Sequence, residues 1–437
     1  NRLGQSQATP FGHHLEIYQE RFQSFGWRTE TIEGHDIEEI LEVLAAVGLG
    51  DQPLVILART LKGGGVSFLQ DKEGWHGKPL SKEESVRAIA ELQPSARSAA
   101  GQPIAAPSPL PAPRNAAPAA YPPTAYAKGL KVATREAYGN ALVRIGGVDP
   151  RVVALDGDTK NSTFSEKFAR QFPDRFTECF IAEQNMVGIA TGFAARSKIP
   201  FASTFAAFLT RACDQIRIAG ISGTNLKLAG SHAGVSIGED GPSQMGLEDL
   251  AILRAVPGAV VLYPCDAVST EKLVEQMTAH QGLCYLRTSR PKTPVIYDNA
   301  EPFPIGGAKI LQQSDHDKVT VVAAGVTVFE ALQAADVLRP CGIHVTVIDA
   351  YSVKPLAVDL IKAAAARTNL LVVTVEDHYP EGGLGDAVAA ALSPDGYRVH
   401  KLAVREVPRS GKSEELLARY GIDAHGIVEK IRSLVSP

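Results

Sequence analysis

The sequence predicts an α/β protein with doubly wound, mostly parallel sheets. Segments with the patterns of strands and helices alternate from residue 132 onward, as expected where helices connect parallel strands. Several predicted strands, among them Leu54–Ala58 and Val152–Leu155, are apolar throughout, which is typical of strands that helices cover on both faces. A segment rich in Pro and Ala interrupts this pattern, so the chain is expected to contain more than one domain.

Residues 1–93 are predicted to form the end of an α/β domain. Residues 14–26 have the pattern of an amphipathic helix, and residues 29–32 have that of a short strand. Asp36 is the expected N-cap of a second helix, which runs to about residue 47 before the apolar strand. The pair His13-His14 is expected to be exposed and inert.

Residues 94–127 are predicted to be an extended linker. The stretch 94–123 contains nine Pro and ten Ala and almost no large apolar side chains. Such a segment cannot build a hydrophobic core, and its Pro content favours polyproline conformations. It therefore marks a boundary between domains.

Two further α/β parts are predicted after the linker, at residues 128–300 and 304–437. In the first part, strands are expected at residues 152–155, 176–181, 200–204, 226–230, 259–263 and 284–287, and helices at 164–172, 184–196, 209–221, 247–254 and 268–280. In the second, smaller part, strands are expected at 319–323, 344–348 and 370–375, and helices at 328–338, 356–367 and 386–392. This alternation is what a doubly wound parallel sheet requires.

The composition limits the classes of function. With 437 residues, 45% of them hydrophobic and 21% charged, the chain has the composition of a soluble globular protein. It contains no run of 18 apolar residues, so no membrane span is expected. The formal charge is −4 with acidic and basic residues interleaved, which argues against nucleic acid as a partner. The five cysteines lack CxxC spacing, and we expect them to be reduced in a cytoplasmic protein.

The acid that follows the predicted strand 176–181 is the first candidate for chemistry. Glu183 stands where this strand gives way to an apolar helix rich in Ala and Gly. Buried neighbours should solvate its charged form poorly, so the carboxyl should retain a proton more readily. Thiamine diphosphate enzymes need such a group, because a glutamate that shares a proton with the aminopyrimidine ring turns the exocyclic amine into a base. The alternative is an acid that the helix dipole favours and that has no catalytic role.

Five motifs occur in order along the part of the chain that follows the linker. They are Asp156–Ser165, Ile181–Met186, Ser203–Phe208, Gly230–His232 and Ser236–Gln244. Together they closely resemble transketolase, and they are nearer to the animal-type enzymes than to the yeast or typical bacterial ones. The resemblance covers essentially the whole chain except the linker. It implies a thiamine diphosphate-binding fold with a C-terminal α/β domain.

The resemblance also implies a role for each part of the chain. Residues 1–93 correspond to the C-terminal remnant of the thiamine diphosphate domain, 128–300 to the pyrimidine-binding domain and 304–437 to the transketolase C-terminal domain. The implied cofactors are thiamine diphosphate and Mg²⁺ or Ca²⁺. The implied reaction, in the pentose phosphate pathway, moves a two-carbon ketol unit from a ketose phosphate such as xylulose 5-phosphate to an aldose phosphate such as ribose 5-phosphate. A homodimer with its active site at the subunit interface is implied as well.

Several residues match the family's cofactor positions. Glu183 is implied to exchange a proton with the aminopyrimidine ring, and His76 to face both the cofactor and the donor sugar, so both are candidate catalytic residues. Phe208 is implied to stack on the pyrimidine. The other residues implied to lie near the cofactor are Phe205, Gln244, Asp158 and Lys62, and the implied metal ligands are the Asn1 side chain and the Leu3 carbonyl. Without the resemblance, the two aromatic residues would be read as core packing, Lys62 as part of a flexible turn and Asn1 as a frayed terminus.

A sugar phosphate needs positively charged donors and hydroxyl contacts. The resemblance assigns Arg135, Ser162 and Arg290 to the phosphate end of the substrate, with His232 towards the same end. Asp240 is implied to accept a hydrogen bond from a substrate hydroxyl deeper in the cleft. Taken singly, the arginines fit ordinary surface salt bridges at least as well.

The chain departs from the family pattern at its start. The metal-binding Gly-Asp-Gly segment and several active-site histidines of the family have no counterpart in residues 1–437. We therefore expect these residues alone to bind the cofactor poorly and to turn over little or nothing. A related thiamine enzyme, such as deoxyxylulose-phosphate synthase or a 2-oxo acid dehydrogenase β-subunit, is the enzymatic alternative. A dimerising or regulatory paralogue without catalysis is the other.

Overall fold

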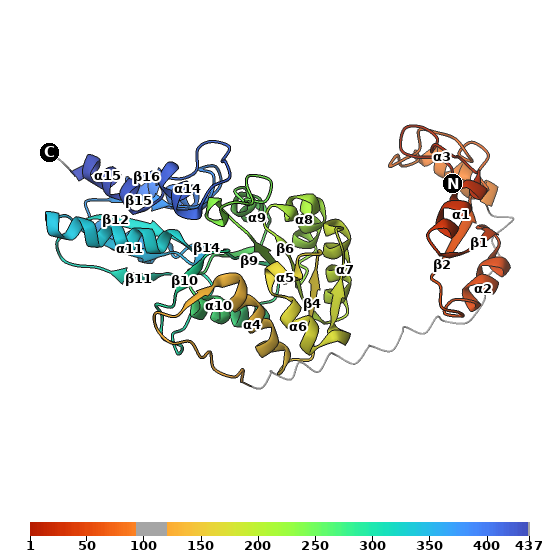
Figure 1. Ribbon diagram of the computed structural model, residues 1–437. Coiled ribbons are helices and arrows are strands. Elements are labelled where there is room, and N and C mark those ends of the chain that lie inside the picture. The colour runs from red at the N-terminus through yellow and green to blue at the C-terminus, as the bar shows by residue number, and fades with distance from the viewer. Residues whose placement is uncertain (93–119, 436–437) are drawn as a thin grey trace. The chain divides into compact units, whose positions relative to one another are not determined.

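The computed structural model describes residues 1–92 and 120–435. The chain divides into two compact units, Asn1–Leu110 and Pro111–Pro437 (Figure 1). Most of the predicted linker 94–127 lies outside the described residues. The predicted domain boundaries stay predictions.

The first unit pairs two parallel strands, against which helices pack. Its elements are α1 (Leu15–Ser24), β1 (Arg28–Glu33), α2 (Ile37–Ala45), β2 (Leu54–Arg59) and α3 (Lys82–Leu92). Asp36 caps α2 as predicted, because its carboxylate accepts the backbone N–H groups of Glu38 and Glu39. The first four elements confirm the sequence prediction, whereas α3 is an element that the pattern did not predict.

The second unit contains a seven-stranded sheet in the order β14-β8-β9-β7-β6-β4-β5. Its strands are β4 (Val152–Asp156), β5 (Phe176–Glu178), β6 (Ile199–Phe205), β7 (Lys227–Ser231), β8 (Val260–Leu262), β9 (Cys284–Arg287) and β14 (Ser352–Lys354). Neighbouring strands run parallel except for β14, which is antiparallel to β8. The sheet is therefore doubly wound and mostly parallel, as predicted.

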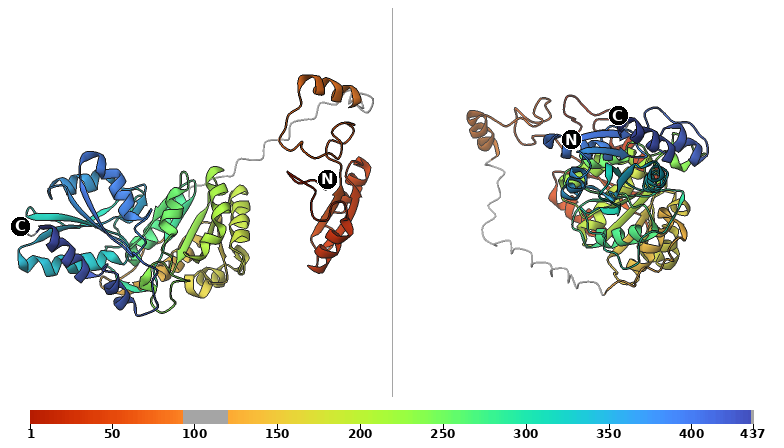
Figure 2. Two further views of the ribbon diagram at one scale, coloured as in Figure 1. Left: turned by 90° about the horizontal axis from the view of Figure 1, so that it is seen from above. Right: turned by 90° about the vertical axis from the view of Figure 1, so that its left-hand side faces the viewer.

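Helices cover both faces of this sheet (Figure 1, Figure 2). They are α4 (Thr134–Gly146), α5 (Lys160–Thr163), α6 (Glu166–Gln171), α7 (Glu183–Ala195), α8 (Cys213–Ile221), α9 (Asp249–Ala255) and α10 (Ala267–Ala279). Val152 and Ala154 of β4 join the hydrophobic cluster that includes residues of α4, α6 and α10. Val153 and Leu155 join the cluster that includes residues of α7 and α8. This alternation is that of a strand with both faces buried.

A second, five-stranded sheet of the same unit has the order β11-β13-β12-β15-β16, with β11 antiparallel to β13 and the other pairs parallel. Its elements are β11 (Lys309–Gln312), β12 (Asp317–Ala323), α11 (Thr327–Leu338), β13 (His344–Asp349), α12 (Val358–Ala366), β15 (Leu371–Val375), α13 (Leu384–Leu392), β16 (Arg398–Leu402), α14 (Ser413–Arg419) and α15 (Ala424–Val435). The predicted strands 319–323, 344–348 and 370–375 are its three central strands. Within the described ranges, no helix of either unit has both the length and the apolar character that crossing a membrane requires.

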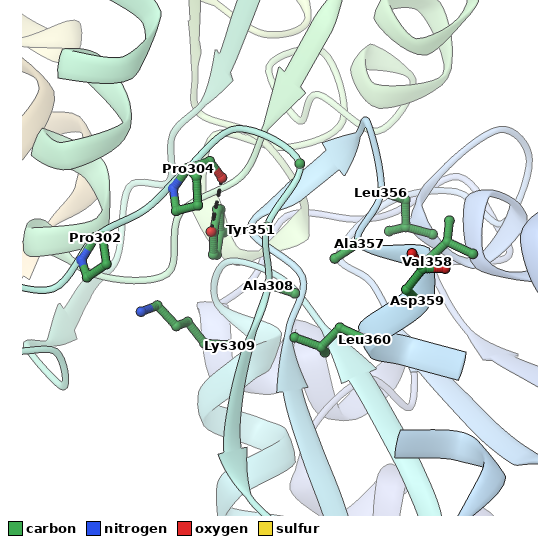
Figure 3. A pocket seen from close by; sticks show the side chains of 12 residues that line it. Pro302, Pro304, Ala308, Lys309, Tyr351, Leu356, Ala357, Val358, Asp359 and Leu360 are labelled. Atoms are coloured by element: carbon green, nitrogen blue, oxygen red, sulfur yellow. Dashed lines mark hydrogen bonds between the residues drawn. The ribbon is translucent and has the colours of Figure 1, made fainter. Parts of the chain in front are cut away.

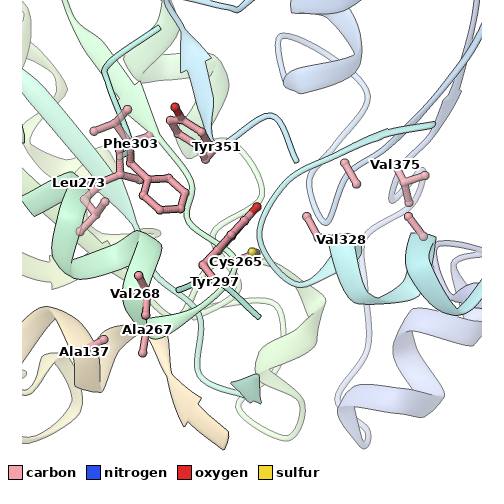
Figure 4. Packing of buried hydrophobic residues seen from close by; sticks show 14 of the residues in the cluster. Ala137, Cys265, Ala267, Val268, Leu273, Tyr297, Phe303, Val328, Tyr351 and Val375 are labelled. Atoms are coloured by element: carbon pink, nitrogen blue, oxygen red, sulfur yellow. The ribbon is translucent and has the colours of Figure 1, made fainter. Parts of the chain in front are cut away.

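The two sheets share a hydrophobic interior (Figure 4). The ring of Phe303 lies 4.9 Å from that of Tyr297 and 5.1 Å from that of Tyr351, edge to face in both cases. Cys265 and Val328 belong to the same cluster. In addition, β14 comes from the part of the chain that forms the second sheet, yet it completes the edge of the first. These contacts hold the two sheets in one compact unit.

Two predicted elements are shorter than expected where the backbone turns left-handed. The predicted strand 176–181 ends at Glu178, and Phe180 has a φ of 55°. The predicted helix 164–172 begins late, as α6 at Glu166, and Phe164, with a φ of 61°, separates it from the short helix α5. Bulky residues rarely adopt this conformation, and such residues cluster at functional sites. The edge of the seven-stranded sheet where these residues lie is therefore a candidate for the functional site.

A buried arginine links three segments near that edge. Arg287 ends β9 and has no exposed surface. Its Nε donates to the Asp249 carboxylate at 2.9 Å, and its Nη2 donates to the carbonyls of Gly246 and Asp377 at 2.8 and 2.9 Å. The Tyr285 hydroxyl donates to the same Asp249 oxygen at 2.6 Å. Arg287 thus ties α9 and the residues before it to the segment that follows β15 in the second sheet.

Replacing this arginine tests the importance of the network. Arg287→Met leaves the buried Asp249 carboxylate without its positively charged partner, which costs about 3–5 kcal/mol in comparable buried pairs. We expect the free energy of unfolding, measured by urea denaturation, to fall by that amount. Arg367→Met breaks an exposed 2.6 Å pair with Asp315 and should cost under about 1 kcal/mol. Equal losses in the two variants would contradict the structural role of the buried arginine.

Candidate active site

Residues that the sequence predicts for the site converge at the carboxyl edge of the seven-stranded sheet. In open α/β sheets this is the edge where ligands bind. Asp158 and Ser162 follow β4, Phe208 follows β6, His232 follows β7 and Arg290 follows β9. Because these strands are parallel and adjacent in the sheet, residues that are far apart in the sequence come together here.

Glu183 is the first residue of α7, and only 1% of its surface is exposed. The burial that the sequence predicts for Glu183 is therefore confirmed. Its carboxylate accepts a hydrogen bond from Arg211 Nη1 at 2.7 Å, and Arg211 belongs to the short helix η3 (Phe208–Ala212). The N-terminus of α7 also places the positive end of a helix dipole at this carboxylate. The acid is thus held against the helix that begins with Phe208. Sequence reasoning did not identify Arg211 as its partner.

Three aromatic rings stack where β6 and β7 end. The ring centroids of Phe205 and Phe208 lie 5.0 Å apart with an angle of 14° between the planes. Those of Phe205 and His232 lie 3.9 Å apart with an angle of 15°. Phe205 is therefore the middle ring, and Phe208 is an outer ring that is only partly buried. Nearly parallel ring faces of this kind can accept a planar heterocycle.

A buried acid shapes the turn after β4. The Asp156 carboxylate accepts the backbone N–H of Thr159 at 2.6 Å and the hydroxyl of Thr163 at 2.6 Å. Burial raises the pKa of Asp156 to about 6, although these donors act in the opposite direction. The resulting turn holds Ser162 in place and leaves Asp158 exposed with a positive φ. The Asp at the start of this motif therefore has a structural role that sequence reasoning missed.

The two predicted phosphate-binding arginines lie in one charged cluster. Arg135 Nη1 donates to the Ser162 carbonyl at 2.9 Å. Arg290 Nη1 donates to the Ile237 carbonyl at 2.7 Å and lies 3.4 Å from the Asp240 carboxylate. Arg135 Nε is buried and has no hydrogen-bond partner among the described residues. An unpaired buried donor of this kind could be satisfied by an anionic ligand.

His232 faces this cluster as a neutral group. Burial lowers the pKa of His232 to about 3, and the charges of Arg135 and Arg290 act in the same direction. Its Nδ1 lies 2.9 Å from the Ser231 hydroxyl. The imidazole is therefore uncharged near pH 7 and can offer a hydrogen bond without adding charge. Gln244 is partly buried, and its side-chain carbonyl accepts the Ser243 hydroxyl at 2.5 Å.

The remaining predicted residues lie in the first unit. The exposed Asn1 accepts the Leu3 backbone N–H with its Oδ1 at 3.1 Å. Lys62 is partly buried at the start of the Gly-rich turn, and its carbonyl accepts the N–H of Asp71 at 2.9 Å. His76 is exposed. Throughout residues 1–92 and 120–435, no group of three His, Cys, Asp or Glu side chains could hold a metal ion. Asn1 and Leu3 therefore offer only part of the oxygen shell that Mg²⁺ requires.

Two histidines of the first unit are held more closely than the sequence indicates. His13 Nε2 lies 3.1 Å from the Thr60 carbonyl, and His35 Nε2 accepts the Leu61 backbone N–H at 2.8 Å. His13 is partly buried and lines a cavity of about 430 Å³ together with Asn1. The expectation that His13 is exposed and inert is therefore wrong in its first half. The hydrogen bond to Thr60 joins segments far apart in the sequence, so no local pattern could predict it.

A larger cavity, of about 550 Å³, lies in the second unit beside β11 and α12 (Figure 3). Two of its polar groups already have partners, because the Tyr351 hydroxyl donates to the Pro304 carbonyl at 3.1 Å and Lys309 pairs with Glu301 at 3.1 Å. The rest of the lining comes mostly from Pro, Gly and aliphatic residues. None of the predicted site residues lines this cavity, so the site is not there.

The described residues fit two parts of a site that binds thiamine diphosphate together with a phosphorylated substrate. A buried carboxyl near stacked aromatic rings suits a flat nitrogen heterocycle. Two arginines with an unpaired buried donor suit the phosphate of a substrate. The metal shell is the part that the described residues do not complete.

Comparisons with known proteins agree along the chain. Residues 12–97 match the family described as the transketolase thiamine diphosphate binding domain, residues 130–295 the transketolase pyrimidine binding domain, and residues 306–427 the transketolase C-terminal domain. Transketolase from Mus musculus is 50% identical over an alignment of 440 positions that covers 100% of this chain and 70% of that protein. Transketolase-like protein 1 from Macaca fascicularis is 48% identical over an alignment of 442 positions that covers 100% of this chain and 74% of that protein.

Two solved structures are also similar. A split-gene transketolase chain, described as an inactive β4 tetramer, is 39% identical with a TM-score of 0.62, over 69% of this chain and 97% of that chain. Transketolase from Campylobacter jejuni is 21% identical with a TM-score of 0.80, over 99% of this chain and 71% of that chain, and shows the same fold. From the family matches and the identity to animal transketolases, the chain belongs to the transketolase family.

Proposed function

We propose that this protein transfers a two-carbon ketol unit from a ketose phosphate to an aldose phosphate, in the pentose phosphate pathway of the cytoplasm. The observation that carries the proposal is the buried Glu183 carboxyl, which accepts a hydrogen bond from Arg211 in η3, the helix that begins with Phe208. Bound thiamine diphosphate would supply the electron sink for breaking and forming the carbon–carbon bond. Membership of the transketolase family supports the same reaction.

Each residue has a role in this proposal. Glu183 holds a proton at the ring nitrogen of the aminopyrimidine, and Arg211 orients its carboxylate. Phe208, with Phe205 behind it, supports the ring by stacking. The phosphate end of the sugar is bound by Arg135, Ser162, His232 and Arg290, and a hydroxyl by Asp240. His76 faces the cofactor and donor sugar, Lys62, Asp158 and Gln244 lie near the cofactor, and Asn1 and Leu3 contribute to the metal site.

Glu183→Gln tests the central role, because it keeps the side-chain shape and removes the acid. A positioned acid or base contributes roughly 10²–10⁴-fold to a proton transfer. We therefore expect deuterium exchange at the reactive carbon of thiamine diphosphate, followed by NMR with Mg²⁺ present, to slow by about that factor. Glu330→Gln is the matched control, since Glu330 is a partly buried acid of α11 that accepts the Ala424 N–H at 2.9 Å. Equal exchange rates in both variants would contradict the assignment.

A chain without catalysis is the second candidate. The similarity to the split-gene transketolase chain described as inactive favours it. Its test, and that of the related thiamine enzymes, is an assay with ribose 5-phosphate as acceptor and either xylulose 5-phosphate or pyruvate as donor. Any turnover, which we expect to be low, should occur with xylulose 5-phosphate only. Consumption of pyruvate would instead indicate a related thiamine enzyme, and thiamine diphosphate binding without any turnover would indicate the non-catalytic role.

We also propose a homodimer with its active site at the subunit interface. Phe180 and Ile181, just before Glu183, are 68% and 71% exposed. The exposed face of α7 carries Gly188 and Gly192, and apart from the adjoining residues and backbone of the same helix no atom lies within 4 Å of a Cβ placed on either. An apolar surface of this kind, beside a helix face that permits close approach, suits a second copy of the chain.

The dimer proposal predicts the effect of a charge at this surface. Ile181→Asp should shift the natural dimer to a monomer in sedimentation equilibrium, because the buried carboxylate would have no partner. Val407→Asp, at a residue that is 73% exposed in the C-terminal part, should leave the dimer unchanged. A natural protein that sediments as a monomer would refute the proposal.

A further inference from the structure

The Asp377 carboxylate, in the part of the chain that forms the second sheet, accepts hydrogen bonds from the backbone of residues 232–246, here called the substrate segment. Asp377 follows β15 and is fully buried. One of its oxygens accepts the backbone N–H of Val235 at 2.7 Å, and the other accepts that of Ser236 at 3.1 Å. These two residues begin the short helix η4 (Val235–Ile237). Hydrogen bonds to an ionised acceptor are stronger than neutral ones, so the carboxylate fixes η4 through its main chain.

The helix η4 in turn anchors one of the proposed phosphate ligands. The carbonyl of Ile237, its last residue, accepts a hydrogen bond from Arg290 Nη1 at 2.7 Å. The same nitrogen lies 3.2 Å from Glu239 and 3.4 Å from Asp240, in the residues after η4. His232 lies three residues before η4. A shift of η4 would therefore move the anchor of Arg290 and the residues on both sides of the helix.

The close approach of the two segments requires a glycine. Gly234, immediately before η4, has a φ of 83°, a conformation that favours glycine. A Cβ at this position would overlap the Asp377 carboxylate. Any other residue here would force the substrate segment away from the acid.

Asp377 is itself held in place. Its backbone carbonyl accepts Arg287 Nη2 at 2.9 Å, and the same nitrogen also donates to the carbonyl of Gly246 at 2.8 Å. Burial raises the pKa of Asp377, whereas the Arg287 charge and the N–H donors of Ser236 and Val235 act in the opposite direction. The substrate segment, residues 232–246, is thus hydrogen-bonded near its start to Asp377 and at its end to Arg287.

We propose that Asp377 is a positioning residue for sugar phosphate binding: its carboxylate sets η4 so that Arg290 and His232 face the phosphate. The proposal rests on the function proposed above and adds to it a contribution of the C-terminal sheet to the substrate site. Asp377 acts through the backbone of η4 and does not touch the substrate itself.

Asp377→Asn tests the proposal, because the amide keeps the size of the side chain but has only one oxygen for the two N–H groups. Two affinities are measured by calorimetry on the full chain, one for ribose 5-phosphate and one for thiamine diphosphate with Mg²⁺. We expect ribose 5-phosphate to bind about tenfold more weakly, as on loss of a charge-assisted hydrogen bond, and the affinity for the cofactor to stay within about twofold. Amide exchange at Val235 and Ser236 should become faster.

Two further variants separate positioning from general stability. Gly234→Ala leaves Asp377 intact but displaces η4, so it should reproduce the selective loss of ribose 5-phosphate binding. Asp317→Asn is the matched control, because Asp317 starts β12 in the same sheet, is 8% exposed and accepts the Ser314 N–H at 2.9 Å. It should change the affinity for ribose 5-phosphate by less than about twofold, even if it lowers the melting temperature.

Two results would overturn the proposal. One is an affinity for ribose 5-phosphate that Asp377→Asn and Gly234→Ala leave unchanged. The other is an equal fall in the affinities for ribose 5-phosphate and thiamine diphosphate, which would indicate general disruption. If the natural protein binds ribose 5-phosphate but transfers no ketol unit, the proposed function fails, and the comparison of the variants still decides the role of Asp377.

Discussion

Parallel strands that end at one edge are the constraint on which the candidate site depends. β4, β6, β7 and β9 lie side by side and run in the same direction. The residues that follow these strands, from Asp158 after β4 to Arg290 after β9, therefore lie along one edge of the sheet. At this edge Phe164, Phe180 and His232 have positive φ, which residues other than glycine rarely adopt. Conformations of this kind persist only where the surrounding contacts hold them. The fold thus places rings, acids and arginines together against local backbone preference.

The second sheet takes part in constructing this edge. Arg287 is enclosed where the two sheets meet, with Asp249 on one side and the carbonyl of Asp377 on the other. Edge-to-face rings fill the apolar part of the junction, and β14 adds a strand from the second sheet's segment to the first sheet. A buried charge that loses its partner is strongly destabilising. The substrate segment is therefore coupled to the C-terminal part of the chain, which family membership alone would not indicate.

Hydrophobic runs and the alternation of elements predicted most strands of both sheets, and the predicted strand 284–287 coincides with β9. Short elements without a periodic pattern escaped prediction, since β14 has three residues and forms through long-range pairing with β8. The order of the motifs placed Glu183 and His232 in one predicted site, but Arg211, the partner of Glu183, belongs to none of the motifs. Arg211 could have been suspected from its place three residues after Phe208, a spacing that brings side chains to one helix face. Asp377 could not, because its contacts with residues 235 and 236 join distant segments.

The most direct test of the account is a crystal structure of the protein with thiamine diphosphate and Mg²⁺. The central claim is that the buried Glu183 carboxyl binds the cofactor's pyrimidine ring. The predicted result is a distance of about 2.6–3.2 Å between this carboxyl and a pyrimidine ring nitrogen, with the ring stacked on Phe208. A bound cofactor whose pyrimidine lies elsewhere, with Glu183 still paired only with Arg211, would contradict the claim.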